Sequence, residues 1–231
     1  MSIPLTELGC GQEAVAAFSK FLSPWDAHIT KCDTDQVIQE YNDLANSYDE
    51  NSLHQTWGRQ MLAFSSNYLV LSPGDRFLDL GCGTGLTGME VKEFCTKLEG
   101  IDLSNSMLEI SRKKNVYDKL TQRDIVDYLL KEELDFDYFI SADVFVYIGD
   151  LSDVFRLIKS RNRSRGRLVF STEHTDKDGF VLKKTGRYSH SKKYIESLCK
   201  KFDYRLSHFE KFDLRKESNN FLTGGLYLLD F

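Results

Sequence analysis

Three glycines after an apolar run are the first residues whose type and spacing could serve chemistry. They are Gly81, Gly83 and Gly85 in "FLDLGCGTG", between a predicted strand and a predicted helix. Glycine lacks a Cβ atom and lets a ligand approach the backbone, and the N-terminus of the following helix favours a negative group. The spacing is GxGxG, because Leu86 stands where a dinucleotide fingerprint would place its third glycine. The turn therefore predicts a ligand site, and a nicotinamide cofactor is disfavoured.

Carboxylates follow at the next two strand ends. Asp102 in "LEGIDLSNSML" can accept hydrogen bonds from both hydroxyls of a ribose, although ribose recognition alone does not choose between cofactors. Asp124 and Ile125 in "TQRDI" could meet an adenine amino group and ring. Because parallel strands end at one edge of a sheet, these residues and the glycine turn are predicted to face one crevice.

Two later strand ends carry the residues that could line the reactive side of a ligand. After "FIS", the small residues Ser141 and Ala142 leave room for a ligand. The polar and aromatic residues beyond them, in "DVFVYI" and "TEHTDKDGFVLKKTGRYSHS", are Asp143, Phe145, Tyr147, Glu173, His174, Tyr188 and His190. The last two follow a glycine-containing excursion that could act as a lid.

The elements that must position these residues alternate along the chain. Short apolar runs predict strands at 77–80, 97–101, 120–123, 136–141 and 167–171, and amphipathic stretches predict helices at 84–94, 106–114, 125–131, 151–159 and 191–202. Two final strands, in "YRLSHFEKFDLR" and "NFLTGGLYLLDF", have no helix between them and should pair antiparallel. We expect a doubly wound α/β fold, with a mainly parallel seven-stranded sheet that ends in a hairpin.

The segment before residue 69 has a different pattern of apolar residues. Apolar residues recur at helical spacing, as in Val37, Tyr41 and Leu44, and Asp33 or Thr34 is a plausible N-cap. We expect residues 1–68 to form a helical N-terminal cap and residues 69–231 to form the ligand-binding domain.

Composition narrows the functional classes. The formal net charge of −5 argues against a nucleic-acid binder with a basic surface. The five cysteines are scattered, without zinc-site spacing, so we expect a reducing compartment and no metal. The N-terminus does not read as a signal peptide, and no apolar run approaches about 18 residues. A cytoplasmic protein is predicted.

Four motifs, in order, resemble the class I S-adenosylmethionine-dependent methyltransferases: "DLGCGTG", "GIDLSNSML", "QRDI" and "FDYFISADVFVYI". The resemblance covers roughly Tyr41 to Phe231. Within this class, "ADVFVYIGDL" and "GRYSHS" are similar to predicted methyltransferases associated with tetratricopeptide repeats and to the Williams-Beuren-region methyltransferase-like proteins. No tetratricopeptide repeat is visible in this chain.

The resemblance implies S-adenosylmethionine as cofactor, and it implies roles for individual residues. Asp79 and the turn from Gly81 to Gly85, with Cys82, would hold the methionine moiety, and the Ser141 and Ala142 backbone would lie near its ammonium group. The remaining cofactor contacts would be Asp102 and Leu103 at the ribose, Met107, Asp124 and Ile125 at the adenine, and Tyr41 and Tyr48 on a closing N-terminal helix.

The chemistry then needs little from the protein, because the sulfonium methyl group is already activated. The protein must align a nucleophile, exclude water and sometimes remove a proton. The candidate catalytic residues are His174, Glu173 and Asp143. The candidate substrate contacts are Trp57, Phe145, Tyr147, Tyr188 and His190.

Plainer interpretations compete for several of these residues. Asp102 could cap the following helix, with Ser104 or Asn105 as the alternative caps, and Asp124 could cap the helix that begins at Ile125. The seven-residue spacing of Tyr41 and Tyr48 also describes a stripe that packs on the core, and Trp57 could be plain core. His174 and His190 could be structural.

Two groups of basic residues also have plain interpretations. The run "RLIKSRNRSRGR" (156–167) is predicted at the amino edge of the sheet, away from the crevice. Lys183, Lys184 and Arg187 could meet an acidic substrate, but a solvated lid is favoured.

We therefore expect an S-adenosylmethionine-dependent methyltransferase that acts on oxygen, nitrogen or carbon of a small molecule, without a nucleic-acid or membrane partner. The alternatives are a nucleic-acid or protein methyltransferase and a non-catalytic regulatory module that binds the same cofactor. The sequence does not identify the methyl acceptor or the oligomeric state.

Overall fold

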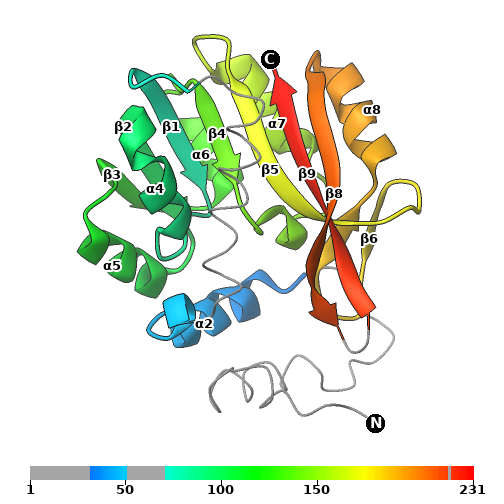
Figure 1. Ribbon diagram of the computed structural model, residues 1–231, viewed down its shortest axis with the longest axis horizontal. Helices are drawn as coiled ribbons and strands as arrows, with labels where there is room; N and C mark the ends of the chain where they lie inside the picture. The colour runs from blue at the N-terminus through cyan, green and yellow to red at the C-terminus, as the bar shows by residue number, and fades with distance from the viewer. Residues whose placement is uncertain (1–31, 51–70, 218–219) are drawn as a thin grey trace.

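A central sheet with helices on both faces organises the chain (Figure 1). The computed structural model describes residues 32–50, 71–217 and 220–231. The strands are β1 (Asp75–Leu80), β2 (Cys95–Asp102), β3 (Lys119–Gln122), β4 (Tyr138–Ser141), β5 (Arg167–His174), β6 (Phe180–Leu182), β7 (Tyr188–His190), β8 (Arg205–Glu217) and β9 (Asn220–Asp230). The helices are α2 (Thr34–Leu44), α4 (Leu86–Val91), α5 (Asn105–Lys114), α6 (Ile125–Lys131), α7 (Ser152–Arg161) and α8 (Lys192–Phe202).

The strand order places a crevice at the middle of the sheet. The order is β3-β2-β1-β4-β5-β7-β6, and β9 pairs antiparallel with β5 and with β8. The first three strands run outward in one direction from β1, and the chain then crosses to β4 on the other side of β1. Open α/β sheets bind ligands where the order reverses in this way, at the carboxyl ends of the strands. The predicted doubly wound fold and its terminal hairpin are confirmed.

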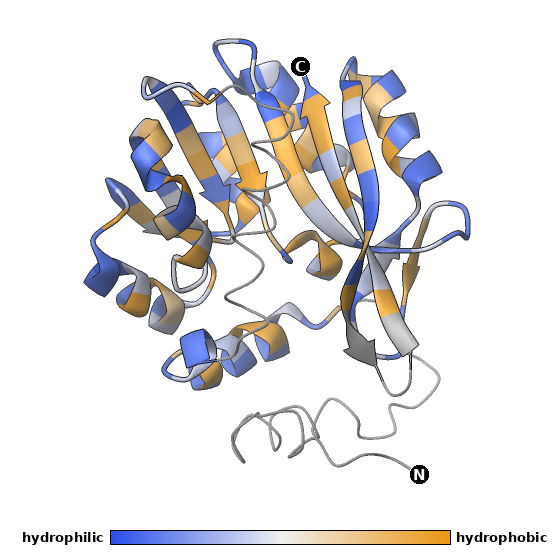
Figure 2. Ribbon diagram, viewed as in Figure 1, coloured by the Kyte–Doolittle hydropathy of each residue, from blue (hydrophilic) through white to orange (hydrophobic). Residues whose placement is uncertain are grey.

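Two apolar layers hold the helices against the sheet. On one face, α6, α7 and α8 bury residues such as Tyr128, Phe155 and Ile195 against Phe139 and Phe170 of the sheet. On the other face, a smaller cluster joins Val91 of α4 to sheet residues. Figure 2 shows hydrophobic residues concentrated on the central strands and mixed faces on the helices. Such amphipathic helices are held mainly by the burial of their apolar side.

Within the described residues the sheet has nine strands, two more than the seven predicted. The additional strands, β6 and β7, form from the excursion after β5, because a turn at Gly186 (φ 76°) brings the two segments together as an antiparallel hairpin. The Lys183 N–H donates to the Arg187 carbonyl across this turn at 2.8 Å. β5 is also longer than predicted and runs through His174, because its last residues pair with β7. The predicted lid is therefore part of the sheet.

The described part of the N-terminal segment is helical, as predicted. Asp33 is the N-cap of α2 and accepts a hydrogen bond from the Gln36 N–H at 3.1 Å. A short 3₁₀ turn, η2, follows at Tyr48–Glu50. Residues 1–31 and 51–70 lie outside the described residues, and so does Trp57. The boundary between a cap (1–68) and a second domain stays a prediction.

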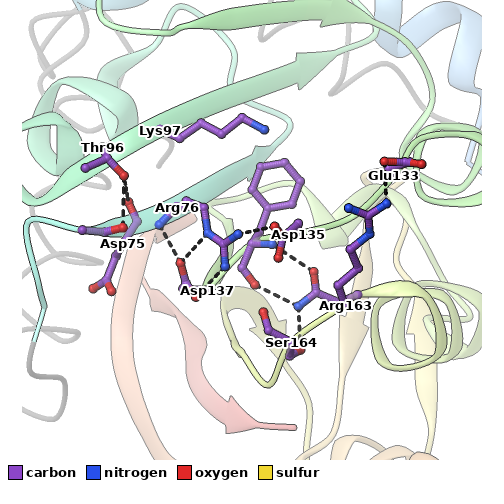
Figure 3. A network of polar contacts seen from close by, with 12 residues as sticks. Asp75, Arg76, Thr96, Lys97, Glu133, Asp135, Asp137, Arg163 and Ser164 are labelled. Carbon is purple, nitrogen blue, oxygen red and sulfur yellow. Dashed lines mark hydrogen bonds and ion pairs between the residues drawn. The ribbon is translucent and has the colours of Figure 1, made fainter.

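A polar network ties the amino ends of the strands together, on the side away from the crevice (Figure 3). Arg76 at the start of β1 pairs with Asp137 just before β4 at 3.0 Å, and also with Asp135. Arg163 pairs with Glu133 at 2.7 Å.

The basic run 156–167 borders this network, as predicted. Most of its cations find partners within the chain: Arg156 pairs with Asp153, Lys159 with Asp203, and Arg167 with Asp230. Arg161 donates to two backbone carbonyls.

Candidate functional site

A cavity opens at the carboxyl ends of the central strands and is covered by α2. Its empty space is about 900 Å³, including the mouth that is open to solvent. The lining residues are Cys32, Thr34, Val37, Ile38, Tyr41, Tyr48, Gly81, Gly83, Asp102, Leu103, Ser104, Arg123, Asp124, Ile125, Ala142, Asp143, Val144, Tyr147 and Ile148. The predicted crevice therefore exists, and nine of the fourteen predicted cofactor residues lie on its wall.

The glycine turn gives the cavity a bare backbone wall. Gly81 and Gly83 both have positive φ angles, of 80° and 54°, which favour glycine. A Cβ atom on Gly81 would come within 2.4 Å of the Val144 side chain. A Cβ atom on Gly83 would meet nothing within 4 Å. Because Gly83 lines the cavity, this open space is a cradle in which a ligand can contact the backbone.

Asp102 lies beside Gly83 at this cradle. One carboxylate oxygen accepts from the Gly83 N–H at 2.9 Å and the other accepts from the Ser104 N–H at 2.8 Å. Burial raises the pKa of Asp102, and these backbone N–H groups oppose the shift. A carboxylate has about four lone-pair sites, so its fixed oxygens can accept further hydrogen bonds. Ser104, not Asp102, caps α5, since its hydroxyl accepts from the Met107 N–H at 3.1 Å.

Asp124 was predicted either to contact a ligand or to cap a helix, and its position is compatible with both roles. It is the N-cap of α6 and accepts from the Asp127 N–H at 3.1 Å. It also lines the cavity beside Ile125. Capping therefore leaves Asp124 at the wall where a ligand contact was predicted.

Five predicted cofactor residues lie behind the wall and do not line the cavity: Asp79, Cys82, Gly85, Met107 and Ser141. Asp79 is buried below the turn, where it accepts a hydrogen bond from the Tyr117 hydroxyl at 2.7 Å. Ser141 donates to the Leu80 carbonyl at 3.2 Å. The sequence motif marks the turn correctly, but alternate side chains of a strand point to opposite faces. These residues support the turn from below.

The protonation of Asp79 should make stability depend on pH. Burial raises its pKa to about 7, against the hydrogen bond from Tyr117 that lowers it. A carboxyl whose pKa is raised on folding stabilises the fold fully below its unfolded pKa, and this stabilisation is lost as pH rises through about 7. Between pH 5 and pH 8, the free energy of unfolding of wild type should fall by about 2 to 3 kcal/mol more than that of Asp79→Asn.

Urea unfolding at the two pH values measures this difference. The exposed control Asp178→Asn should keep the wild-type pH dependence, because Asp178 lies at the surface opposite Lys193. Equal pH dependence in wild type and Asp79→Asn would contradict the assignment.

Three tyrosines form the opposite wall. The hydroxyls of Tyr41 and Tyr147 lie 2.8 Å apart, and their rings meet edge to face at 5.9 Å. Tyr48 packs on Tyr41 with ring centroids 6.0 Å apart. Burial raises the pKa of both Tyr41 and Tyr48, so these two hydroxyls are neutral at physiological pH. The predicted stripe therefore packs on the core domain and lines the cavity at the same time.

Two polar contacts fasten this segment over the cavity. Asn42 of α2 accepts a hydrogen bond from the Ser104 hydroxyl at 2.6 Å. Asp49 accepts from the Thr84 hydroxyl at 2.5 Å and pairs with Lys114 at 2.6 Å. The sequence motifs do not single out Asn42 or Asp49, because their partners are distant in the chain. These contacts keep the tyrosines against the sheet edge.

Asp143 is the one predicted catalytic residue on the cavity wall. Its φ angle of 56° is left-handed, which is uncommon for a residue other than glycine, although Asp and Asn adopt it most readily. Its N–H donates to the Ser171 hydroxyl at 2.9 Å. The Ser171 side chain of β5 therefore anchors the backbone of Asp143.

Arg187 is a functional candidate that sequence reasoning assigned to a solvated lid, and that assignment was wrong. Its side chain is only 15% exposed, and its guanidinium lies 5.3 Å from the centre of the Tyr147 ring. It also lies 3.9 Å from Glu173, which pairs with Lys183 at 3.3 Å. Burial opposes its charge, but Tyr147 and Asp143 raise its pKa above the ordinary value. The β6-β7 hairpin thus carries Arg187 in beneath the tyrosines.

The other two predicted catalytic residues stand behind the wall. Glu173 is fully buried within β5. His174 lies next to it in the strand, with its ring 3.1 Å from the Asp176 carboxylate and packed on Phe209, and burial lowers its pKa. Because β5 continues through His174, both residues lie within the strand, beyond its predicted end at Ser171.

Of the predicted substrate contacts that the structure describes, one lines the cavity and the others lie behind its wall. Tyr147 lines the cavity, whereas Phe145 is buried in the core against Phe170. His190 is fully buried, its Nε2 lies 3.0 and 2.9 Å from the Ile148 and Gly149 carbonyls, and burial lowers its pKa to about 4. The Tyr188 hydroxyl accepts from the Cys32 N–H at 3.4 Å, behind the wall.

The face of α2 that lines the cavity has a signature in residue spacing alone. Thr34, Val37, Ile38 and Tyr41 occupy positions i, i+3, i+4 and i+7, which form one side of a helix. Of these four, the sequence analysis identified only Tyr41 as a site residue. Of the missed positions, Val37 and Ile38 add apolar side chains to this wall.

A known protein family shares the sheet and the glycine turn. The profile of a family described as "Methyltransferase domain" matches residues 71–221, which carry both features. The chain belongs to the methyltransferase-domain family. This membership agrees with the resemblance to the class I methyltransferases. The match does not show the narrower subgroup associated with tetratricopeptide repeats and the Williams-Beuren region.

Two curated relatives, both named as methyltransferases, match parts of the chain. A malonyl-[acyl-carrier protein] O-methyltransferase of Serratia marcescens is 27% identical over 137 residues, which are 59% of this chain and 52% of that protein. A probable fatty acid methyltransferase of Pseudomonas putida is 27% identical over 150 residues, covering 53% of this chain and 36% of that protein. The chain thus spans about half the length, or less, of these relatives.

Two solved structures share the fold. The N-methyltransferase NodS of Bradyrhizobium japonicum WM9, in complex with S-adenosylhomocysteine, aligns with a TM-score of 0.63 at 16% identity and covers 84% of this chain and 96% of that one. The magnesium protoporphyrin IX methyltransferase of Synechocystis PCC 6803, with bound S-adenosylmethionine, aligns with a TM-score of 0.60 at 15% identity and covers 95% and 91%.

Membrane spans and metal centres are both absent from the residues that the structure describes. Within these ranges, no helix has the length and apolar character needed to cross a bilayer. In the same part of the chain, no group of three or more His, Cys, Asp or Glu residues could hold a metal ion.

Proposed function

We propose that the chain is an S-adenosylmethionine-dependent methyltransferase that transfers a methyl group to a small molecule. The observation that carries this proposal is the cradle between Gly83 and Asp102. Gly83, whose missing Cβ leaves open space, and the partly buried carboxylate of Asp102, which accepts from the Gly83 N–H, line the cavity side by side at the switch point of the sheet. This arrangement fits a ligand that joins a ribose to a group lying against the glycine turn.

The residues on the wall would divide the cofactor among them. Asp102 would hold the ribose hydroxyls, Asp124 and Ile125 the adenine, and the Gly81–Gly83 backbone with Ala142 the methionine part. The bound cofactor supplies an activated methyl group. The chain itself would orient that group and exclude water, with α2 fastened over the cavity by Asn42.

The charges on the wall favour a cationic cofactor over a dinucleotide. The wall carries three carboxylates, Asp102, Asp124 and Asp143, and the lining guanidinium of Arg123 pairs with Glu132 outside it. Such a surface complements a sulfonium cation and opposes a pyrophosphate. The absent third glycine at Leu86 agrees with this preference.

A small acceptor is favoured over a nucleic acid. The basic run 156–167 lies at the amino ends of the strands, on the far side of the sheet from the cavity, and most of its cations pair within the chain. The relatives named above act, by their names, on malonyl-[acyl-carrier protein], fatty acids and a porphyrin, so family membership does not fix the acceptor. The four described cysteines are free thiols, which agrees with the reducing compartment that we expect.

Incubation of the protein with trideuteromethyl-labelled S-adenosylmethionine and small-molecule extracts tests this function. Mass spectrometry should find a product heavier by one labelled methyl group, absent from incubations with Asp102→Ala. Incubation with RNA should leave the label untransferred. Binding of the cofactor without any labelled small-molecule product would instead favour the non-catalytic regulatory module.

A further inference from the structure

We propose that the methyl acceptor is a small molecule with an apolar body, and that Val37 and Ile38 of α2 and Ile148 of the loop after β4 bind that body. The proposal rests on the proposed function and deepens it by naming the acceptor class. It depends on the wall that remains beside the cofactor, on the side chains of that wall and on the contacts among its polar groups.

The proposed cofactor contacts leave part of the cavity wall for the acceptor. Those contacts come from the glycine turn, from Asp102, from Asp124 with Ile125 and from Ala142, all at the carboxyl ends of β1 to β4. Most of the remaining wall comes from α2, from the tyrosines and from the rest of the loop after β4. An acceptor in the same cavity therefore meets α2 and this loop.

Apolar side chains make up much of this remaining wall. Val37 and Ile38 lie on the same face of α2 as Tyr41, at spacings of i+4 and i+3. The loop after β4 adds Val144 and Ile148. Each of these apolar side chains is only half-buried, so a ligand can cover surface that otherwise meets water. Each CH₂ group that a ligand buries in this way strengthens binding by about fourfold.

The polar groups of this wall are engaged with one another. The hydroxyls of Tyr41 and Tyr147 lie 2.8 Å apart, and Arg187 lies on the Tyr147 ring, 5.3 Å from its centre. Burial opposes the charge of Arg187, but Tyr147 and Asp143 raise its pKa. Because Arg187 and Asp143 carry opposite charges, they offset one another. Burial raises the pKa of the Cys32 thiol, which is therefore neutral. This wall therefore selects its ligand by apolar contact more than by charge.

A polyhydroxylated body fits this wall less well. Each buried hydroxyl needs a hydrogen-bond partner, and a hydroxyl buried without one costs free energy. The side chains of Val37, Ile38 and Ile148 carry no donor or acceptor. An apolar ring loses no hydrogen bond on the same surface. The wall therefore favours an apolar body that carries a single polar group toward the cofactor.

Binding of three probes with the same CH₂OH group tests the acceptor class. Benzyl alcohol, cyclohexylmethanol and glucose each attach this group to a six-membered ring, and only the ring of glucose carries hydroxyls. Each probe is titrated by ligand-observed NMR into wild-type protein saturated with S-adenosylhomocysteine. Benzyl alcohol and cyclohexylmethanol should bind about tenfold or more tightly than glucose, because their rings bury apolar surface and leave no hydroxyl without a partner.

Ile38→Gln should weaken the binding of benzyl alcohol by about fivefold, because it replaces apolar surface with an amide. Gln favours a helix at least as well as Ile does, so α2 should persist. Retained binding of S-adenosylhomocysteine shows that the cavity is intact. Leu130→Gln is the matched control. Leu130 of α6 is 50% exposed and lies outside the cavity lining, so this variant should bind benzyl alcohol as wild type does.

Three outcomes would overturn the proposed acceptor class: binding of glucose as tight as that of benzyl alcohol, an unchanged affinity for benzyl alcohol in Ile38→Gln, or no binding of any probe. All three are read in protein that binds S-adenosylhomocysteine. Failure of that binding would count against the proposed function instead.

Discussion

Replacing Asp102 with alanine should weaken the binding of S-adenosylhomocysteine on the order of 100-fold, because a charged acceptor of two ribose hydrogen bonds is lost and each such bond contributes about 1.5 to 3 kcal/mol. The same change leaves the Gly83 and Ser104 N–H groups without the carboxylate that orients them. Isothermal titration calorimetry measures the affinity, and circular dichroism checks the fold.

Asp178→Ala is a control for the loss of a carboxylate, since Asp178 is exposed beside Lys193 and lies outside the cavity lining. It should bind with wild-type affinity. An Asp102→Ala protein that is folded and binds S-adenosylhomocysteine as wild type does would show that the carboxylate does not face the ligand.

Adding a single methyl group at Gly83 should weaken binding by about tenfold or more while the protein stays folded. In Gly83→Ala the new Cβ meets no protein atom within 4 Å and instead occupies the cradle. The left-handed backbone should cost about 1 to 2 kcal/mol of stability. Calorimetry gives the affinity and thermal unfolding gives the stability.

Gly179 offers a matched control within the same chain. Its φ angle of 83° is also left-handed and its Cβ would also meet nothing within 4 Å, but it does not line the cavity. Gly179→Ala should therefore lose similar stability and keep full affinity. Equal affinities in the two variants would contradict a ligand against Gly83. Gly81→Ala should behave differently again and destabilise the protein most, because its Cβ would collide with Val144.

The cofactor side of the site was predictable because its signals are local in sequence. Strand alternation with helices fixes the sheet edge, and each motif residue sits at a strand end, so the sequence alone places Gly83, Asp102 and Asp124 together. The same local logic explains why Asp79 and Ser141 lie behind the wall. A motif identifies a turn, whereas the face on which each side chain emerges depends on the strand phase.

The acceptor side was less predictable because contacts between distant segments build it. Glu173 and His174 were expected at the carboxyl end of a strand that stops near Ser171, but Glu173 pairs with Ser189 of β7 on one side and with Gly224 of β9 on the other, so β5 continues. Arg187 reaches Tyr147 only because the β6-β7 hairpin folds back. No single stretch of sequence contains these pairings.

The central claim is that the cavity binds S-adenosylmethionine. Calorimetric titration of wild type with S-adenosylhomocysteine and, separately, with NAD tests it most directly. We predict binding of S-adenosylhomocysteine with one site per chain, which Asp102→Ala weakens, and no detectable binding of NAD. Binding of NAD without binding of S-adenosylhomocysteine would contradict the account.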